Sequence, residues 1–465
     1  MTMQDQNPRS DGARDEDFAG MHGAEFRRFV RALERVACVD PIFLRGYTIT
    51  RDVHSGQVVH MISSEDMPYR RLMVPCRNRR GDVCLPCSLL HKGDTFQLVM
   101  SGLMGGKGVP KEVATHPSVF VTLAAPSFGA VHRAGDPEKP GNRCHPWADE
   151  PTCRHGVPRT CTKRHAYWDA DVGTPLCEAC YDYVGAVLWN ASSGALWHRY
   201  TDQVRRMVAT HAGVPRTRLG EVVKVAFLKV AEYQRRGMIH FHAVVRFDGP
   251  AGPGDDPPDW ADVELLRQIT EDAAARASVH LPGPPGIGER VMTFGEQATA
   301  EPVADGDARR SVSAYVAKYV TKGDVATMVR AKPLAVRSQI EVSALSNFGK
   351  RLMYTAWDLG GYPEYARLNL RKWAHQLGFK GNIATKSRTY STTYKELREA
   401  RAAFAKAAAG VVEPEAGTTV KESRWRFVGK GLTPAQAEIA AGIADGVVAR
   451  RGPRPDWIPH PDELA

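Results

Sequence analysis

The sequence contains no long hydrophobic segment. No stretch approaches the roughly 18 consecutive apolar residues that a membrane-spanning helix requires. The opening residues, MTMQDQNPRSDGARDEDFAG, are polar and lack the apolar core of a signal peptide. We therefore expect a cytoplasmic protein that has no membrane partner.

A nucleotide-binding loop is also missing. The segment 102–108, GLMGGKG, does not have the spacing G-x-x-x-x-G-K-[ST] of a phosphate-binding loop. We therefore expect no nucleotide cofactor. Since such a chain cannot couple ATP hydrolysis to strand separation, any unwinding of DNA would require a separate host helicase.

Acidic residues are fewer than basic ones. The 465 residues include 62 Lys and Arg but only 52 Asp and Glu, which gives a formal net charge of +10. Hydrophobic residues make up 43% of the chain, an ordinary value for a globular protein. The basic excess favours a polyanionic partner, and nucleic acid before a membrane surface.

The pattern along the chain predicts an α+β protein with four regions. They are a disordered tail at 1–22, an N-terminal helix with a first cysteine module at 23–117, a core at 118–325 with a cysteine-rich insertion at about 130–181, and a basic, mainly helical region at 326–465. Apolar residues at helical spacing and strand-like runs place the main elements. We expect helices at 24–39, 89–103, 182–211, 260–279, 311–322, 395–409 and 434–449, a strand at 118–125 and a strand pair within 221–247.

Two histidines stand on the second strand of that pair. His240 and His242 are two residues apart, so their side chains leave the same face of the strand, while Ile239 and Phe241 point into the core. A three-residue turn, Arg235-Arg236-Gly237 with Gly237 in the left-handed conformation, would place Glu232 opposite His240. Two imidazoles and a carboxylate suit a hard divalent cation such as Mg²⁺ or Mn²⁺. The alternatives are a two-residue turn, which would spoil this set, and two unrelated surface histidines.

Two tyrosines stand one turn apart on a predicted helix. In SVSAYVAKYVTK, Tyr315 and Tyr319 share one face, and each is followed three residues later by a lysine, Lys318 or Lys322. A phenol is a poor nucleophile unless a cation stabilises its oxyanion, and a lysine on the next turn can do so. Tyrosines at this spacing are also common as packing residues.

In combination, these motifs resemble those of the HUH endonucleases. EYQRRGMIHFH followed by YVAKYVTK is similar to the two-tyrosine replication initiators of rolling-circle phages and plasmids and to Helitron-type transposases. FVTLAAP at 120–126 sits where those families have a TLT-like strand, with Ala at a position that is usually Thr. The segments GGKGVP, VFVTLAAPSFGAVH and VGAVLWNASSGALW resemble the RepSA-like initiators of actinobacterial plasmids and integrative conjugative elements.

This resemblance implies a fold and a set of roles. The fold would be an HUH nuclease core with a central antiparallel sheet of the split ferredoxin-like or RRM-like kind, elaborated by zinc-ribbon-like insertions. His240, His242 and Glu232 would bind the divalent metal. Tyr319 and Tyr315 would be the nucleophiles, with Tyr319 favoured as the essential one, and Lys318 and Lys322 would assist them.

The implied activity is that of a replication initiator. Such an enzyme nicks one strand of single-stranded or hairpin origin DNA, remains joined to it through a 5′-phosphotyrosine link, and leaves a 3′-hydroxyl for a host polymerase. One alternative is a transposase or conjugative relaxase with the same chemistry. A second alternative is a zinc-dependent DNA-binding regulator without catalysis.

Cysteines are the remaining motif. Disulfides are rare in the cytoplasm, so the nine cysteines are expected to be thiols or metal ligands. Two C-x-x-C pairs are typical of zinc knuckles. With Cys38 set aside, the expected ligands of one or two structural zinc ions are Cys76, Cys84, Cys87, Cys144, Cys153, Cys161, Cys177 and Cys180.

One zinc site could join the two knuckles, and a nearby histidine (His145, His155 or His165) could replace a cysteine in either site. Buried thiols without metal are the alternative.

Basic residues suggest where DNA could bind. Arg77, Arg79 and Arg80 lie beside the first cysteines, and Arg235 and Arg236 lie in the predicted turn. Between 330 and 390, basic residues alternate with aromatic ones, as in surfaces that bind single-stranded DNA. Each of these sets is also compatible with a solvated surface or with core packing.

Overall fold

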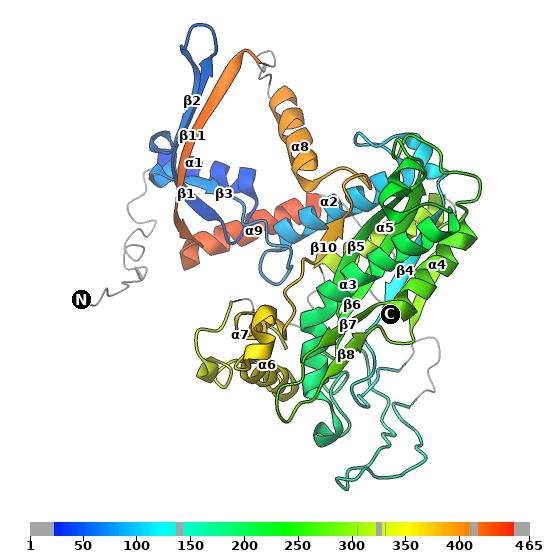
Figure 1. Cartoon of the computed structure of the whole chain (residues 1–465). Coiled ribbons are helices and arrows are strands. Elements are labelled where there is room, and N and C mark those ends of the chain that lie inside the picture. The colour runs from blue at the N-terminus through cyan, green and yellow to red at the C-terminus, as the bar shows by residue number, and fades with distance from the viewer. Residues whose placement is uncertain are drawn as a thin grey trace. The chain divides into compact units, whose positions relative to one another are not determined.

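The computed structural model describes residues 23–135, 143–304, 306–321, 328–330, 332–408, 410 and 417–450. The expected tail at 1–22 lies outside the described residues, as do Lys322 and the side chain of Tyr319. Spatial contacts divide the described chain into two compact units (Figure 1). The central unit comprises residues 95–394, and the terminal unit comprises residues 23–94 together with those after 394.

The central unit is built on a five-stranded antiparallel sheet. Its strand order is β10-β5-β6-β4-β9, so β4, the first of these five strands along the chain, lies between β6 and β9. The strands are β4 (Ser118–Leu123), β5 (Lys224–Tyr233), β6 (Ile239–Asp248), β9 (Ala298–Pro302) and β10 (Ala384–Lys386). A separate hairpin pairs β7 (Ser278–Leu281) with β8 (Arg290–Thr293).

One face of this sheet carries the main hydrophobic core. Ile239 and Phe241 of β6 are fully buried in a cluster that includes Leu188 and Trp189, as their apolar character predicts. This cluster draws residues from four helices, whose course Figure 1 shows: α3 (Tyr183–His211), α4 (Val263–Arg276), α6 (Asn347–Leu359) and the short α7 (Leu370–Trp373). Met328, Leu334 and Ile340 join it from loops. Because side chains alternate along a strand, the even-numbered residues of β6 face the other way.

The opposite face is covered by α5 (Gly306–Thr321) and the second half of α2 (Leu85–Met104). Arg246 of β6 is fully buried there and donates to both carboxylate oxygens of Asp248, at 2.7 and 2.9 Å, and to the carbonyl of Gly102. His116 contacts the same carboxylate at 2.8 Å. Arg246, Asp248 and His116 thus form a buried ionic group at one end of this face of the sheet. His240 and His242 lie at the other end of the same face.

The terminal unit is assembled from both ends of the described chain. β1 (Ile42–Asp52) is the middle strand of a sheet and pairs with β2 (Val58–Ser63), with β3 (Leu72–Val74) and with β11 (Thr419–Lys430). Gly46 has φ of +145°, and a Cβ atom there would collide with the carbonyl of Arg424, so only glycine allows β11 to approach so closely. The helices are α1 (Gly23–Val36), α8 (Tyr394–Ala408) and α9 (Pro434–Arg450). Phe29 and Leu33 of α1 pack against Ala440 of α9.

The expected mixture of helices and antiparallel strands is confirmed, and each helix and strand expected from the pattern is present within a few residues of its expected bounds. Two strands in the C-terminal region were not expected, because this region was expected to be mainly helical. β10 is only three residues long, and β11 is exposed along most of its length, so neither gives a clear apolar signal.

Among the described residues, no helix combines the length and apolar character needed to cross a bilayer.

Lys229 of β5 provides a test of the central core. Its side chain is 4% exposed, and its Nζ lies 4.5 Å from the ring centre of Phe241. Burial lowers the pKa of Lys229 to about 8. Below this pH the folded state carries a buried positive charge, which lowers the free energy of unfolding. This destabilisation decreases as the pH rises from 8 towards the ordinary lysine pKa, because the buried amine is then neutral.

We therefore expect Lys229→Met to increase the free energy of unfolding by about 1–3 kcal/mol at pH 7. The gain should shrink as the pH approaches 10, because the unmodified lysine is then neutral when folded. Urea unfolding of both proteins at several pH values measures this difference, and a destabilised methionine variant at pH 7 would contradict it.

Candidate active site and metal-binding groups

The turn between β5 and β6 sets the register of the candidate site. Gln234 and Met238 close the turn through a 2.8 Å backbone hydrogen bond, leaving Arg235, Arg236 and Gly237 as its three residues. Gly237 adopts φ of +75°, in the left-handed region. Glu232 therefore pairs with His240 across the two strands, as the three-residue turn predicts.

Glu232, His240 and His242 lie close together on the face opposite the main core. Oε2 of Glu232 is 3.4 Å from Nε2 of His242, and the two imidazole ring centres are 4.6 Å apart. His242 is 3% exposed. A divalent cation with ligands at about 2.1 Å brings neighbouring ligand atoms to about 3 Å, which is close to the 3.4 Å between Glu232 and His242.

Neighbouring polar side chains orient both histidines. Nδ1 of His242 lies 3.4 Å from Oγ1 of Thr122, which is its direct partner on β4. Nδ1 of His240 lies 3.2 Å from the side-chain amide of Gln234 in the turn. The sequence interpretation missed Thr122 and Gln234 in this role, although both lie within the motifs that it quoted. The hydroxyl of Thr122 can accept a hydrogen bond from Nδ1, which is the usual support of a metal-ligating histidine, whereas the amide nitrogen of Gln234 can only donate to Nδ1 of His240.

Tyr315 of α5 lies against the same site. Its ring centre is 5.1 Å from that of His242, with the planes at 86°, and Phe120 of β4 contacts both rings. Lys318 follows on the same helix. The structure thus brings one candidate nucleophile next to the histidine pair, while the side chain of Tyr319 and the whole of Lys322 lie outside the described part.

The cysteines fall into three groups, each with four potential ligand atoms within 4.8 Å of one another. Each group contains cysteines far apart in the chain, and two of them include histidines. The groups are Cys38, Cys76, Cys84 and Cys87; His132, Cys144, Cys161 and His165; and Cys153, His155, Cys177 and Cys180. Such sets could hold zinc.

The distances within these groups match tetrahedral zinc. Ligand bonds of about 2.3 Å to sulfur and 2.0–2.1 Å to nitrogen give edges of about 3.8 Å between two sulfurs and about 3.6 Å between sulfur and nitrogen. Sγ of Cys84 is 3.8 Å from Sγ of Cys38, Nε2 of His165 is 3.4 Å from Sγ of Cys161, and Nδ1 of His155 is 3.8 Å from Sγ of Cys177.

Backbone amides support the sulfur atoms. The amide of Arg133 donates to Sγ of Cys144 at 3.2 Å, and that of Cys76 donates to Sγ of Cys38 at 3.3 Å. Contact with the Cys38 side chain lowers the pKa of Cys76 to about 7. The amide donors favour the thiolate form that binds metal, whereas contacts among the thiols raise the pKa of Cys38 and Cys87.

The expected pairing of the knuckles is wrong. Cys84 and Cys87 lie in one group and Cys177 and Cys180 in another, so no single site joins them. Cys38, which had been set aside, completes the first group. A C-x-x-C pair supplies two ligands but carries no information about the distant residues that supply the rest.

His155 and His165 belong to two of these groups, whereas His145 is not in any of the three. His132 is a ligand candidate that the sequence interpretation missed, since it is separated from every C-x-x-C pair. In the described part of the insertion, isolated bridges such as His145 to Cys161 stand in place of regular strands.

Comparisons with known proteins identify the family of this chain. Residues 25–445 match the model of the family described as RepSA, the replication initiator protein of pSAM2. The chain belongs to the RepSA family of replication initiators. It is also 38% identical over 428 residues to a replication initiator protein of Streptomyces ambofaciens, with 89% of each chain covered. No solved structure gives a significant match.

The arginines proposed for DNA contact are partly engaged within the initiator itself. Arg236 donates to the carbonyls of Ala125 and Pro126 at 2.7 and 2.9 Å, and Arg80 pairs with Asp82. Arg77 is exposed. DNA contact by these residues remains a prediction.

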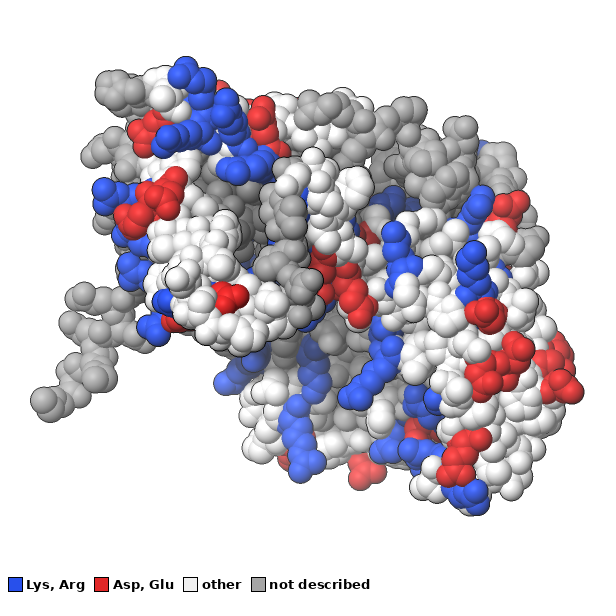
Figure 2. Space-filling view, turned by 90° about the horizontal axis from the view of Figure 1, so that it is seen from above, with Lys and Arg blue, Asp and Glu red and all other residues white. Residues whose placement is uncertain are grey.

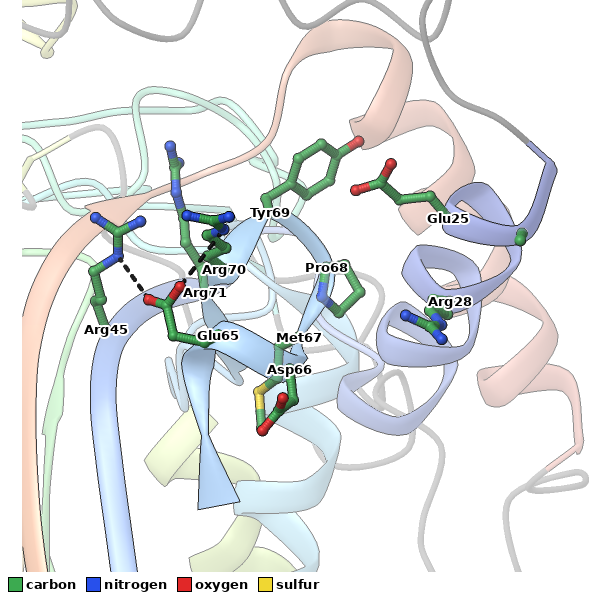
Figure 3. A pocket seen from close by; sticks show the side chains of 11 residues that line it. Glu25, Arg28, Arg45, Glu65, Asp66, Met67, Pro68, Tyr69, Arg70 and Arg71 are labelled. Atoms are coloured by element: carbon green, nitrogen blue, oxygen red, sulfur yellow. Dashed lines mark ion pairs between the residues drawn. The ribbon is translucent and has the colours of Figure 1, made fainter. Parts of the chain in front are cut away.

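The terminal unit contains a cavity of about 950 Å³ with charges of both signs (Figure 3). Glu65 lies 4.0 Å from Arg45 and 3.5 Å from Arg70, and these ion pairs are dashed in Figure 3. Arg28 and Arg71 also line the cavity, as do the carboxylates of Glu25 and Asp66. The acidic side chains offset much of the positive charge, so the cavity is not a purely anion-binding site.

The surface charge is similarly mixed. Figure 2 shows Lys and Arg side chains on one face, interspersed with acidic and uncharged residues. Of the aromatic residues between 330 and 390, Tyr365, Phe379 and Tyr390 are at most 3% exposed. These three belong to the interior, so they cannot serve as stacking platforms for bases in this conformation.

Replacement of the carboxylate tests the candidate divalent-metal site. We expect Glu232→Gln to weaken Mn²⁺ binding to the zinc-loaded initiator by about tenfold or more, because one charged ligand is lost. Glu301→Gln, on the exposed surface of β9, is the matched control and should bind like the unmodified protein. Calorimetric titration measures both, and equal affinities for all three proteins would contradict the assignment.

Proposed function

We propose that this replication initiator nicks one strand of its origin DNA by transesterification to a tyrosine, and so starts rolling-circle replication. The observation that carries the proposal is the contact between Tyr315 and His242, whose neighbours Glu232 and His240 complete a potential divalent-metal set. Family membership supports the biological setting.

Glu232, His240 and His242 would hold Mg²⁺ or Mn²⁺ next to the scissile phosphate. When bound, the cation would offset the negative charge that develops on the phosphate oxygens. Glu232, His240 and His242 stand on two paired strands, and Thr122 of the neighbouring strand β4 lies 3.4 Å from Nδ1 of His242, which favours a preorganised site.

The tyrosine oxygen would then attack the phosphorus atom in line with the departing group. A bond forms between this oxygen and phosphorus, the bond from phosphorus to the 3′ oxygen breaks, and the 3′ oxygen takes up a proton. The products are a 5′-phosphotyrosine link and a 3′-hydroxyl that a host polymerase could extend. Since one phosphate ester replaces another, a later 3′-hydroxyl could reverse the step and close the strand.

Tyr315 and Tyr319 would be the nucleophiles, with Tyr319 as the essential one. They occupy positions one helical turn apart, so either could approach one site. Lys318 and Lys322 would stabilise the phenolate or the phosphate under attack. Two nucleophiles would permit a second cleavage without release of the first strand.

The cysteine groups would hold structural zinc. The described loops of the insertion are poor in apolar residues, and segments of this kind depend on metal to fold. The proposed zinc therefore stabilises the fold and takes no part in the phosphoryl transfer.

The experiment that tests the proposal detects the covalent intermediate. The full-length protein is incubated with Mn²⁺ and labelled single-stranded oligonucleotides that tile the origin of the element encoding it. We expect an adduct that survives denaturation, and a loss of about 1,000-fold or more in its rate of formation when Tyr315 and Tyr319 are both changed to Phe. Tyr319→Phe alone should have a larger effect than Tyr315→Phe alone.

Tyr362→Phe, at an exposed position after α6, is the matched control and should form the adduct normally. Adduct formation by the double variant at the normal rate would refute the nucleophile assignment. Origin binding without any adduct in the unmodified protein would favour a regulator without catalysis.

A further inference from the structure

The second cysteine–histidine group lies beside the turn that carries the candidate active site. A cavity of about 820 Å³ is lined on one side by His132, Arg133 and His145, and on another by Gln234, Arg235 and Arg236. Two separate sets of contacts connect His165 and His132, two ligand candidates of this group, with the turn.

The first connection runs through Asp169. Its carboxylate lies 2.7 Å from Nδ1 of His165, which leaves Nε2 directed towards Sγ of Cys161 at 3.4 Å. A carboxylate at Nδ1 is the usual support of a zinc-bound histidine. The backbone carbonyl of the same Asp169 accepts a 2.9 Å hydrogen bond from the guanidinium of Arg235, which also packs over the ring of Tyr167.

The second connection runs through Gly173. Its amide donates to the carbonyl of His132 at 2.8 Å, and the amide of His132 donates to the carbonyl of Thr174 at 2.9 Å. A Cβ atom on Gly173 would collide with the backbone carbonyl of Arg235. The segment that includes His132 is thus packed directly against the backbone of the turn.

The third group provides a contrast within the same insertion. Beside its ligand candidates Cys177 and Cys180, Glu178 accepts a 2.7 Å hydrogen bond from Arg351 of α6. This hydrogen bond connects the third group to a helix, whereas the two connections of the second group lead to the β5–β6 turn.

We propose that a zinc ion held by His132, Cys144, Cys161 and His165 braces the turn at 234–238 and thereby positions Glu232, Gln234 and His240. The zinc is a positioning element in this inference, since none of its ligands belongs to the candidate active site. The inference goes beyond the proposed function and concerns the rigidity of the turn, whether or not the site cleaves DNA.

The test combines zinc content with hydrogen exchange of the turn amides in the full-length protein. We expect His132→Ala to lose one equivalent of zinc and to accelerate exchange at the amides of Gln234 and Gly237 by about tenfold. His155→Ala, the matched control in the third group, should also lose one equivalent but leave exchange at the turn unchanged. Equal acceleration in both variants, or in neither, would overturn the proposal.

Arg235→Met tests the connection without altering a ligand, and so keeps the proposal falsifiable if His132→Ala does not fold. This variant should retain all of its zinc and still show faster exchange at the turn. Unchanged exchange would show that the zinc group does not act through Arg235. Neither readout uses nicking activity, so failure of the proposed function would leave this result interpretable.

Discussion

The register of one hairpin is the constraint on which the candidate site depends. In a β-strand, a shift of one residue moves every side chain to the opposite face. The left-handed Gly237 permits the three-residue turn, and a Cβ atom there would lie 2.8 Å from Cε of Met328. With this turn, Glu232 and the two histidines share a face with Tyr315, while Phe241 enters the core. A two-residue turn would turn a different set of β5 side chains towards the core and would leave no carboxylate opposite His240.

Groups of cysteine and histidine that could hold zinc are a second feature of the structure, and they lie in loop segments with few regular strands. The first cysteine group joins the loop after α1 to the start of α2, and the other two groups lie in an insertion with few regular strands. In each group, ligands distant in sequence converge at distances suited to one zinc ion. Each ion would replace a hydrophobic cluster that these segments cannot form themselves. The terminal unit uses a further device, since β11 pairs along the whole of β1 from the other end of the chain.

Local patterns predicted much of this structure, and long-range pairings account for most of what they missed. The alternation in MIHFHAVVRF predicts the buried and site-facing sides of β6, and the turn RRG predicts the partner of His240. By contrast, Cys38 has no neighbouring cysteine, and His132 lies apart from the C-x-x-C pairs, so only the folded chain reveals them as ligand candidates. The sequence of β11 also gives no clear strand signal, because its charged residues face solvent and its partner strand, β1, lies more than 350 residues away. Gln234 and Thr122 were missed because their contacts depend on how the histidine rings are oriented.

We propose that a metal-binding histidine pair and a tyrosine oxygen meet at one phosphodiester. The most direct measurement is anomalous diffraction from crystals of the full chain grown with Mn²⁺ and a short single-stranded origin oligonucleotide. We expect a manganese peak between Glu232, His240 and His242, with a phosphate oxygen among its ligands and a tyrosine hydroxyl of α5 directed at the phosphorus atom. Manganese bound elsewhere, or both tyrosine hydroxyls directed away from the phosphate, would contradict it.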